Sequence, residues 1–292
     1  MPVDILGPAA RVTALHFCKG AAAVLVLFAA STAARADDEA PAAAGTPAAG
    51  ARWLLGIAAA RSPDYSGSDR SKAKLSPLWA WQSGRYRIST SRAGGILGFG
   101  VDSPGPGASV EMFSSERLRF GAALRVDSGR SSGDSPLLAG LPDVRRTLRA
   151  RLFGSYAIDA NWGLGATLSQ DLLGRHGGAI GTLDLGYRKF IAPKTEWSSG
   201  VGIAYGSQPY MRSYFGVTEL SAQQTGIAAY APNAGLRDVH FGTGITSALT
   251  EHWIAFAGIG GASLRGQAAA SPLTRATGNV AASAGIAYRW GP

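Results

Sequence analysis

The sequence predicts an all-β protein, an antiparallel transmembrane β-barrel of about 12 strands, and three observations support this fold class. A short apolar segment near the N-terminus predicts export, alternating apolar and polar residues predict strands, and the connections alternate between short and long. Strands of roughly ten residues that alternate with period two, joined by short turns on one side and longer loops on the other, are typical of outer-membrane barrels. We expect residues 52–292 to form this barrel.

Residues 1–36 have the composition of a secretory signal peptide. Arg11 and Lys19 precede an apolar run from Ala21 to Ala30, and a small-residue cleavage site ends at Ala36. A charged start, a short apolar core and a small-residue end are the parts of such a signal. The run is too short to cross a bilayer as a helix, which needs roughly 20 apolar residues. We therefore expect cleavage after Ala36.

The rest of the composition narrows the classes of function. Cys18, the only cysteine, would leave with the signal, so the mature chain would have neither a disulfide nor a thiolate metal site. Residues 37–51 form a low-complexity linker rich in Ala, Pro and Gly. The formal charge of the chain is +9, but its basic residues are dispersed and form no long run. We therefore expect no nucleic-acid partner.

Period-two alternation runs through the remainder of the chain. One face of each segment is apolar, and the other is rich in Gly, Ser, Thr and Arg; the clearest segments are 118–126, 148–152, 162–168, 183–187 and 280–290. Aromatic residues gather at the segment ends, as the interfacial girdles of membrane barrels do. The small polar face distinguishes this pattern from a soluble sandwich, which buries bulky aliphatic side chains.

The connections set the number of strands. Short turns are expected near Ser83-Gly84, Asp159-Ala160, Ala192-Pro193 and Thr250-Glu251, and the longest loops are 62–74, 128–146, 172–177, 207–236 and 266–277. Eleven strands are expected to start near 53, 75, 86, 117, 147, 161, 178, 195, 237, 252 and 278. An even number closes the barrel, so we place a twelfth within Gly94–Ser114. Ten strands is the alternative.

Charged residues on the polar face are the main candidates for function. The alternation predicts a set of lumen-lining residues: Arg85, Arg87, Arg119, Arg125, Arg149, Arg151, Asp184 and Arg188. Asp127 and Asp184 are candidate partners for these arginines. The lumen is then either filled by arginine–carboxylate networks, which satisfy buried charges, or forms a narrow channel that favours anions.

The longest predicted loop is unusually rich in aromatic residues. Because exposed aromatic side chains favour collapse, we expect residues 207–236 to fold over or into the barrel mouth. The candidate lid residues are Tyr210, Met211, Tyr214, Phe215 and Tyr230.

Motifs for catalysis are weak. Residues 129–133 match G-x-S-x-G, but a polar loop surrounds them in place of the strand-to-helix turn that a nucleophile requires. His176, His240 and His252 lack metal-ligand spacing, and Asp64 and Asp69 fit an exposed turn better than a calcium loop. We expect no catalytic residue, no metal site and no cofactor.

Several longer motifs resemble the MipA/OmpV family of outer-membrane proteins. They are PDYSGSD at 63–69, SPLWAWQSGRYRIS at 76–89, GLPDV at 140–144, GRHGG at 174–178, the segment 210–239 and the segment 250–273. The resemblance covers nearly all of the chain after the linker. It implies a barrel in the outer membrane, in contact with lipid and lipopolysaccharide.

What the resemblance implies for function is a scaffold. The family takes its name from a member that binds a lytic murein transglycosylase and is thought to hold it beside a murein synthase, a penicillin-binding protein. Other members are described as porin-like or as adhesins. The resemblance therefore implies a non-enzymatic scaffold for peptidoglycan remodelling, with a porin-like channel and a surface adhesin as alternatives.

Overall fold

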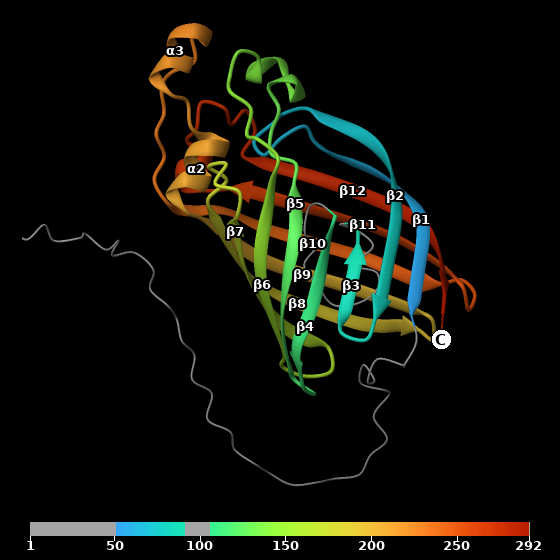
Figure 1. Cartoon of the computed structure of the whole chain (residues 1–292). Helices are drawn as coiled ribbons and strands as arrows, with labels where there is room; N and C mark the ends of the chain where they lie inside the picture. The colour runs from blue at the N-terminus through green and yellow to red at the C-terminus, as the bar shows by residue number, and fades with distance from the viewer. Residues whose placement is uncertain (1–50, 91–105, 292) are drawn as a thin grey trace, which may run out of the picture. The chain divides into compact units, whose positions relative to one another are not determined.

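The computed structural model describes residues 51–90 and 106–291 and shows a closed antiparallel barrel (Figure 1). Each strand pairs with its neighbours in sequence, and the first pairs with the last. The strands are β1 (Arg52–Pro63), β2 (Ser71–Ser83), β3 (Tyr86–Ser89), β4 (Gly107–Ser114), β5 (Leu118–Asp127), β6 (Thr147–Ala157), β7 (Trp162–Asp171), β8 (Ala179–Ala192), β9 (Thr195–Gly206), β10 (Gly235–Ala248), β11 (Trp253–Leu264) and β12 (Gly278–Trp290). The predicted fold class and strand number are confirmed. The predicted signal peptide, residues 1–36, and the linker up to residue 50 lie outside the described residues.

Helices occur only in the longer connections of the described part of the chain. They are η1 (Ser132–Asp134), η2 (Pro136–Leu138), α2 (Gln208–Phe215), α3 (Glu219–Thr225) and α4 (Gly266–Ala269). None of these helices has the length and apolar composition needed to cross a membrane. All of them lie at one end of the barrel, which we call the long-loop end, and the opposite end is the short-turn end.

Two strand boundaries correct or refine the predictions. The twelfth strand, β4, lies inside the expected stretch Gly94–Ser114. The loop expected at 62–74 is shorter, because β2 begins at Ser71 and pairs with β1 as far as Pro63. The pairing between β1 and β2 continues beyond their apolar residues. The alternation of side chains therefore underestimates the length of both strands.

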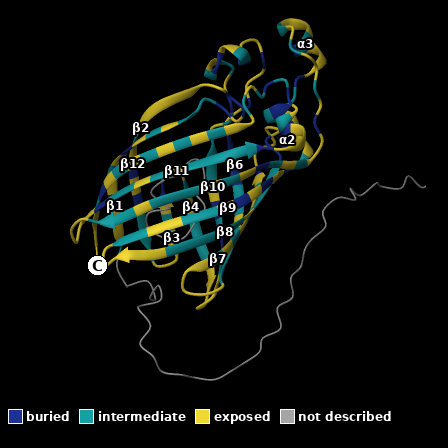
Figure 2. Cartoon of the chain, turned by 180° about the vertical axis from the view of Figure 1, so that it is seen from behind, coloured by how far each residue is buried: buried dark blue, intermediate teal, exposed yellow. Residues whose placement is uncertain are grey.

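The outer face of the barrel is apolar. Leu124, Leu168, Leu183 and Val201 all point outward and are about half exposed. Exposed and less exposed residues alternate along β12, as Figure 2 shows. Because a closed barrel satisfies its backbone hydrogen bonds internally, this apolar face suits a hydrocarbon environment.

A band of aromatic residues surrounds the short-turn end. Trp53 stacks on Trp290, with ring centroids 6.3 Å apart, and Trp253 meets Tyr288 edge-on at 5.2 Å. On the other side of the barrel, Tyr187 makes edge contacts with both of its neighbours, Trp162 at 4.9 Å and Trp197 at 5.6 Å. Tryptophan and tyrosine favour the membrane–water interface, so this band marks one edge of the apolar belt.

The inner face differs from the prediction near the short-turn end. We expected small and charged residues there, but Leu54, Leu78 and Ala287 form a buried apolar cluster with Ala58 and Ala80. Leu54 is only 1% exposed, although the adjacent Leu55 points outward and is 55% exposed. Small neighbours on β1 and β12 leave room for these leucines, so part of the lumen is a packed core.

Candidate functional site

The candidate site is the charged network at the long-loop end, where α2 meets the inner wall of the barrel. Tyr210, Met211 and Phe215 on α2 are buried with Leu264 and Ala268. The Ser207 hydroxyl, just before the helix, accepts a hydrogen bond from the Ala179 backbone at 2.8 Å. Figure 1 shows α2 at the long-loop end, and the helix contacts β8 and β10.

Gly178 allows α2 to approach the wall closely. Its φ is +56°, a conformation that favours glycine. A Cβ atom at this position would lie 2.3 Å from the Tyr210 backbone nitrogen. The glycine-rich segment 174–178 therefore provides the space that the helix occupies.

One half of the network joins α2 to β5 and β6. The Arg149 Nε lies 2.6 Å from Asp127 Oδ2, and Arg149 is 6% exposed. The same guanidinium donates to the carbonyl oxygens of Gly177 and Gly178 at 2.7 and 3.1 Å. The Tyr214 hydroxyl of α2 donates to Asp127 at 3.0 Å. Burial, reinforced by the Asp127 carboxylate, raises the pKa of Tyr214, so this hydroxyl remains a donor.

The other half joins α2 to β10. A β-bulge between Leu236 and Asp238 interrupts the pairing with β9, and Arg237 lies in it. Because a bulge changes the direction of side chains, Arg237 and Asp238 both face the network and form an ion pair. Arg237 also donates to the Tyr210 hydroxyl at 2.8 Å.

His240 extends the network to β8. Its Nδ1 lies 2.8 Å from Asp238 and its Nε2 lies 2.8 Å from Asp184. A carboxylate oxygen only accepts hydrogen bonds, so with both carboxylates ionised the ring donates from both nitrogens and carries a positive charge. The structure thus pairs Asp184, a candidate partner for an arginine, with this histidine, and the Thr182 hydroxyl also donates to Asp184 at 3.0 Å.

Arginines continue from this network along the inner wall toward the short-turn end. The strand registers place Arg87, Arg119, Arg125, Arg151 and Arg188 on the inner face of β3, β5, β6 and β8. Glu111 is an electrostatic neighbour of Arg87, and Glu196 of Arg188. We call these five residues the arginine ladder.

Arg85 does not belong to this wall. It is exposed in the turn between β2 and β3, where its carbonyl accepts a hydrogen bond from Glu111. The predicted alternation placed Arg85 in a strand, but β2 ends at Ser83 and β3 begins at Tyr86. Arg149 does face inward, directly across from Arg125 of the ladder, but it belongs to the network with α2.

The five lid candidates separate into two groups. Tyr210, Met211, Tyr214 and Phe215 lie on α2, whereas Tyr230 donates to the Gln267 carbonyl at 2.8 Å. Tyr230 packs against a cluster of loop residues formed by Tyr65, Leu138, Leu141, Val217 and Leu273. Burial raises the pKa of Tyr65, whose hydroxyl donates to the Leu273 carbonyl at 2.9 Å. This cluster joins four long loops above α2.

The remaining candidates carry little chemistry. His176 is exposed in a loop, and His252 stacks on Tyr288 at the short-turn end. Within residues 51–90 and 106–291, no group of three or more His, Cys, Asp or Glu residues is placed to hold a metal ion. Residues 129–133 form a loop that leads into the three-residue 3-10 helix η1, and no α-helix follows Ser131 as a nucleophile turn requires.

Sequence reasoning missed three parts of this site. His240 was treated only as a candidate metal ligand, although the spacing Asp238-x-His240 places both side chains on one face of a strand. Arg237 was missed because simple alternation directs it outward. Glu111 and Glu196 alternate with the outward residues of β4 and β9. The sequence alone could therefore have placed both on the inner face of the barrel.

Comparison with protein-family models matches residues 55–290 to the family described as MltA-interacting protein MipA. The chain belongs to the MipA family. Apart from the first three residues of β1, this MipA-family match covers the strands of the barrel, and the predicted family is confirmed. A search of curated proteins finds no match.

Solved structures with similar architecture include three outer-membrane proteins. An outer membrane channel from Pseudomonas putida F1 has 10% identity and a TM-score of 0.46, covering 87% of this chain and 100% of that one. The NanC porin has 10% identity and a TM-score of 0.42, covering 80% and 98%. The KdgM porin has 8% identity and a TM-score of 0.37, also covering 80% and 98%.

Proposed function

We propose that this MipA-family barrel is a non-enzymatic scaffold of the outer membrane that holds murein-remodelling enzymes, such as a lytic transglycosylase, at the periplasmic side. The observation that carries the proposal is the network that joins α2 to β5, β6, β8 and β10. Buried ion pairs with satisfied hydrogen bonds hold one geometry. A barrel with such a network at one end and an apolar cluster at the other suits an anchor better than a wide pore.

The partner in this proposal comes from the family. Its description names an interaction with MltA, and we transfer that class of partner, a murein transglycosylase, together with a penicillin-binding protein. In outer-membrane barrels the short turns face the periplasm. The partner surface would then be the short-turn end, the linker at 37–51, or both.

Crosslinking tests the scaffold. A photo-crosslinking residue at Glu116, Ala160 or Lys194, which are exposed in three different short turns, is expected to capture a murein enzyme in living cells. The matched control is Glu219, exposed on α3 at the opposite end. Mass spectrometry identifies the captured protein. Capture of no murein enzyme above the Glu219 background from any of these turns or from the linker would contradict the scaffold.

The location has its own prediction. We expect cleavage after Ala36 and recovery of the mature protein in the outer-membrane fraction, because residues 1–36 have the parts of a signal peptide. Intact-mass measurement reports the cleavage site. The folded barrel is expected to migrate differently on a gel before and after heating. A soluble periplasmic protein without this heat-dependent shift would contradict the membrane location.

A narrow channel that favours anions is the second candidate function. The observation that favours it is the arginine ladder, which presents five guanidinium groups on one inner wall. Rings or rows of arginine concentrate anions and repel cations. In this case α2 would act as a lid on the outer mouth, and its removal would change the conductance.

A further inference from the structure

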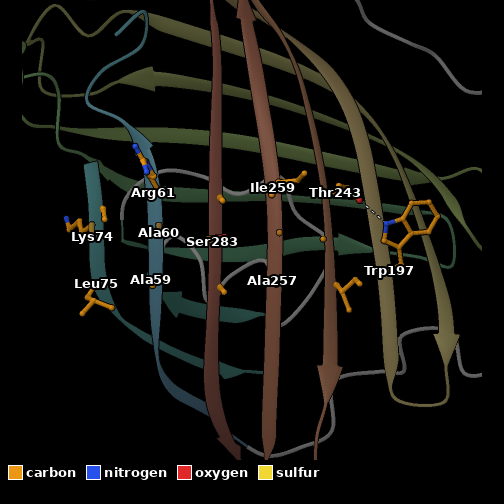
Figure 3. A pocket seen from close by; sticks show the side chains of 16 residues that line it. Ala59, Ala60, Arg61, Lys74, Leu75, Trp197, Thr243, Ala257, Ile259 and Ser283 are labelled. Carbon is orange, nitrogen blue, oxygen red and sulfur yellow. Dashed lines mark hydrogen bonds between the residues drawn. The ribbon is translucent and has the colours of Figure 1, made fainter. Parts of the chain in front are cut away.

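The outside of the barrel contains a shallow hollow across six neighbouring strands (Figure 3). Its volume is about 950 Å3. The strand registers arrange its outward residues in two adjacent rows: Leu75, Ala59, Ala284, Ala257, Ile245 and Trp197 in one, and Ala73, Arg61, Ala282, Ile259 and Thr243 in the other.

The pattern of side-chain size produces the hollow. Alanines occupy the middle of the first row, on β1, β12 and β11, and the second row has alanines on β2 and β12. Larger side chains form its borders, with Leu75 on one side and Ile245 and Trp197 on the other. Trp197 is fixed there, because its indole nitrogen donates to the Thr243 hydroxyl at 2.8 Å.

A positive charge borders the apolar hollow at its edge toward the long loops. Arg61 is exposed there, two residues before the end of β1, and its Nε donates to the Ser71 hydroxyl at 2.8 Å. Lys74 also lies along the hollow, although its pairing with Ala60 puts it on the inner parity of β2, and no acidic residue lines the hollow. The ion pairs formed by the described residues include neither Arg61 nor Lys74.

We propose that this hollow binds lipopolysaccharide, with an acyl chain against the alanines and a phosphate group on Arg61. An empty hollow in hydrocarbon loses van der Waals contacts, which a flexible acyl chain restores. Arginine is well suited to phosphate because its guanidinium offers several donors in one plane. Long loops face outward in outer-membrane barrels, so Arg61 lies in the leaflet that contains lipopolysaccharide.

A second copy of the chain fits this surface less well. A two-fold contact would place the same hollow on both sides of the interface. Arg61 of both copies would then lie in a low-dielectric interface with no carboxylate in either hollow. Burying charges without partners is unfavourable. The charge of the hollow therefore favours an anionic lipid over self-association.

The inference rests on the outer-membrane location proposed above, but not on the scaffold role. Its test uses the purified, delipidated full-length mature protein in vesicles that contain either lipopolysaccharide or phosphatidylglycerol. After extraction, native mass spectrometry measures the lipid retained by each barrel. Failure of crosslinking to murein enzymes would leave this measurement unaffected, so the two proposals are tested separately.

Four variants make the test specific. Ala257→Trp fills the hollow and Arg61→Gln removes its charge, and each is expected to lower the retained lipopolysaccharide about tenfold, which corresponds to about 1.4 kcal/mol. Ala166→Trp, at an exposed outward alanine on β7, is the control for the tryptophan and is expected to retain wild-type amounts. Arg61→Lys keeps the charge without the planar donors and is expected to retain more lipopolysaccharide than Arg61→Gln. The heat-dependent gel shift identifies the variants that fold.

Three results would overturn the proposal. The first is equal retention by the Arg61→Gln and Arg61→Lys variants. The second is equal retention of phosphatidylglycerol and lipopolysaccharide by the wild-type protein. The third is a dimer that forms through the hollow and is lost in the Ala257→Trp variant. If the tryptophan variant does not fold, Arg61→Gln, on the exposed edge, still decides the outcome.

Discussion

Removing the lid loop is expected to convert a poorly conducting barrel into an anion-selective one. The change replaces residues 208–234 with a short Gly-Ser turn, which the pairing of Gly206 with Gly235 allows. The physical reason is that α2 leaves the mouth together with Tyr210 and Tyr214, while the arginine ladder stays on the wall. Planar-bilayer recordings with different salt concentrations on the two sides measure the conductance and the selectivity.

The arginines should determine whether the lidless barrel prefers anions to cations. Electrostatic focusing of this kind raises the local anion concentration by about tenfold or more. Adding Arg125→Ser and Arg151→Ser to the lidless barrel is therefore expected to reduce its preference for anions. A variant with Ser109→Ala, a neutral inner-face change on β4, is the control.

The possible results separate the two candidate functions. A large stable conductance in the intact protein would contradict the anchored scaffold. No conductance in either form would contradict the channel and would leave the arginines as structural filling. Conductance only after the loop is removed would support a lid.

The alternation of side chains predicted most of the barrel because lipid and lumen impose opposite requirements on the two faces of each strand. This worked for β5, β7 and β12, where one face is bulky and apolar and the other is small or polar. It was less informative for β1, where both Leu54 and Leu55 are apolar although only Leu54 is buried. Periodicity identifies a face, but it does not reveal which part of the lumen is packed.

The site was less predictable than the fold because its contacts depend on the relative heights of distant strands. Asp127 and Arg149 lie on neighbouring strands, and their pairing was among the expected arginine–carboxylate contacts. Asp184 instead meets His240, 56 residues away and two strands along the barrel. Arg237 faces the network only because of a β-bulge, and no local sequence pattern predicts that bulge. Such contacts depend on the stagger of hydrogen-bond register between the strands of the closed barrel. Side-chain alternation within one strand does not predict this stagger.

The same network predicts a large loss of stability when Arg149 is replaced. Arg149→Met leaves the Asp127 carboxylate without its buried cation and removes the donors to the Gly177 and Gly178 carbonyls. Removing one partner of a buried ion pair costs about 3–5 kcal/mol. Urea unfolding in detergent, followed by tryptophan fluorescence, is expected to show a decrease of that size in the free energy of unfolding.

An exposed ion pair supplies the control for this prediction. Lys72 lies 3.2 Å from Asp134 between β2 and η1, and both side chains are substantially exposed. Lys72→Gln is expected to cost about 1 kcal/mol or less, because solvent screens such pairs. If the two substitutions destabilise the barrel equally, the buried network does not hold α2.

A further comparison with Tyr214→Phe locates the effect, since that variant removes only the hydrogen bond to Asp127. The double variant of Arg149 and Tyr214 should then cost less than the sum of the single variants, because both side chains bind the same carboxylate.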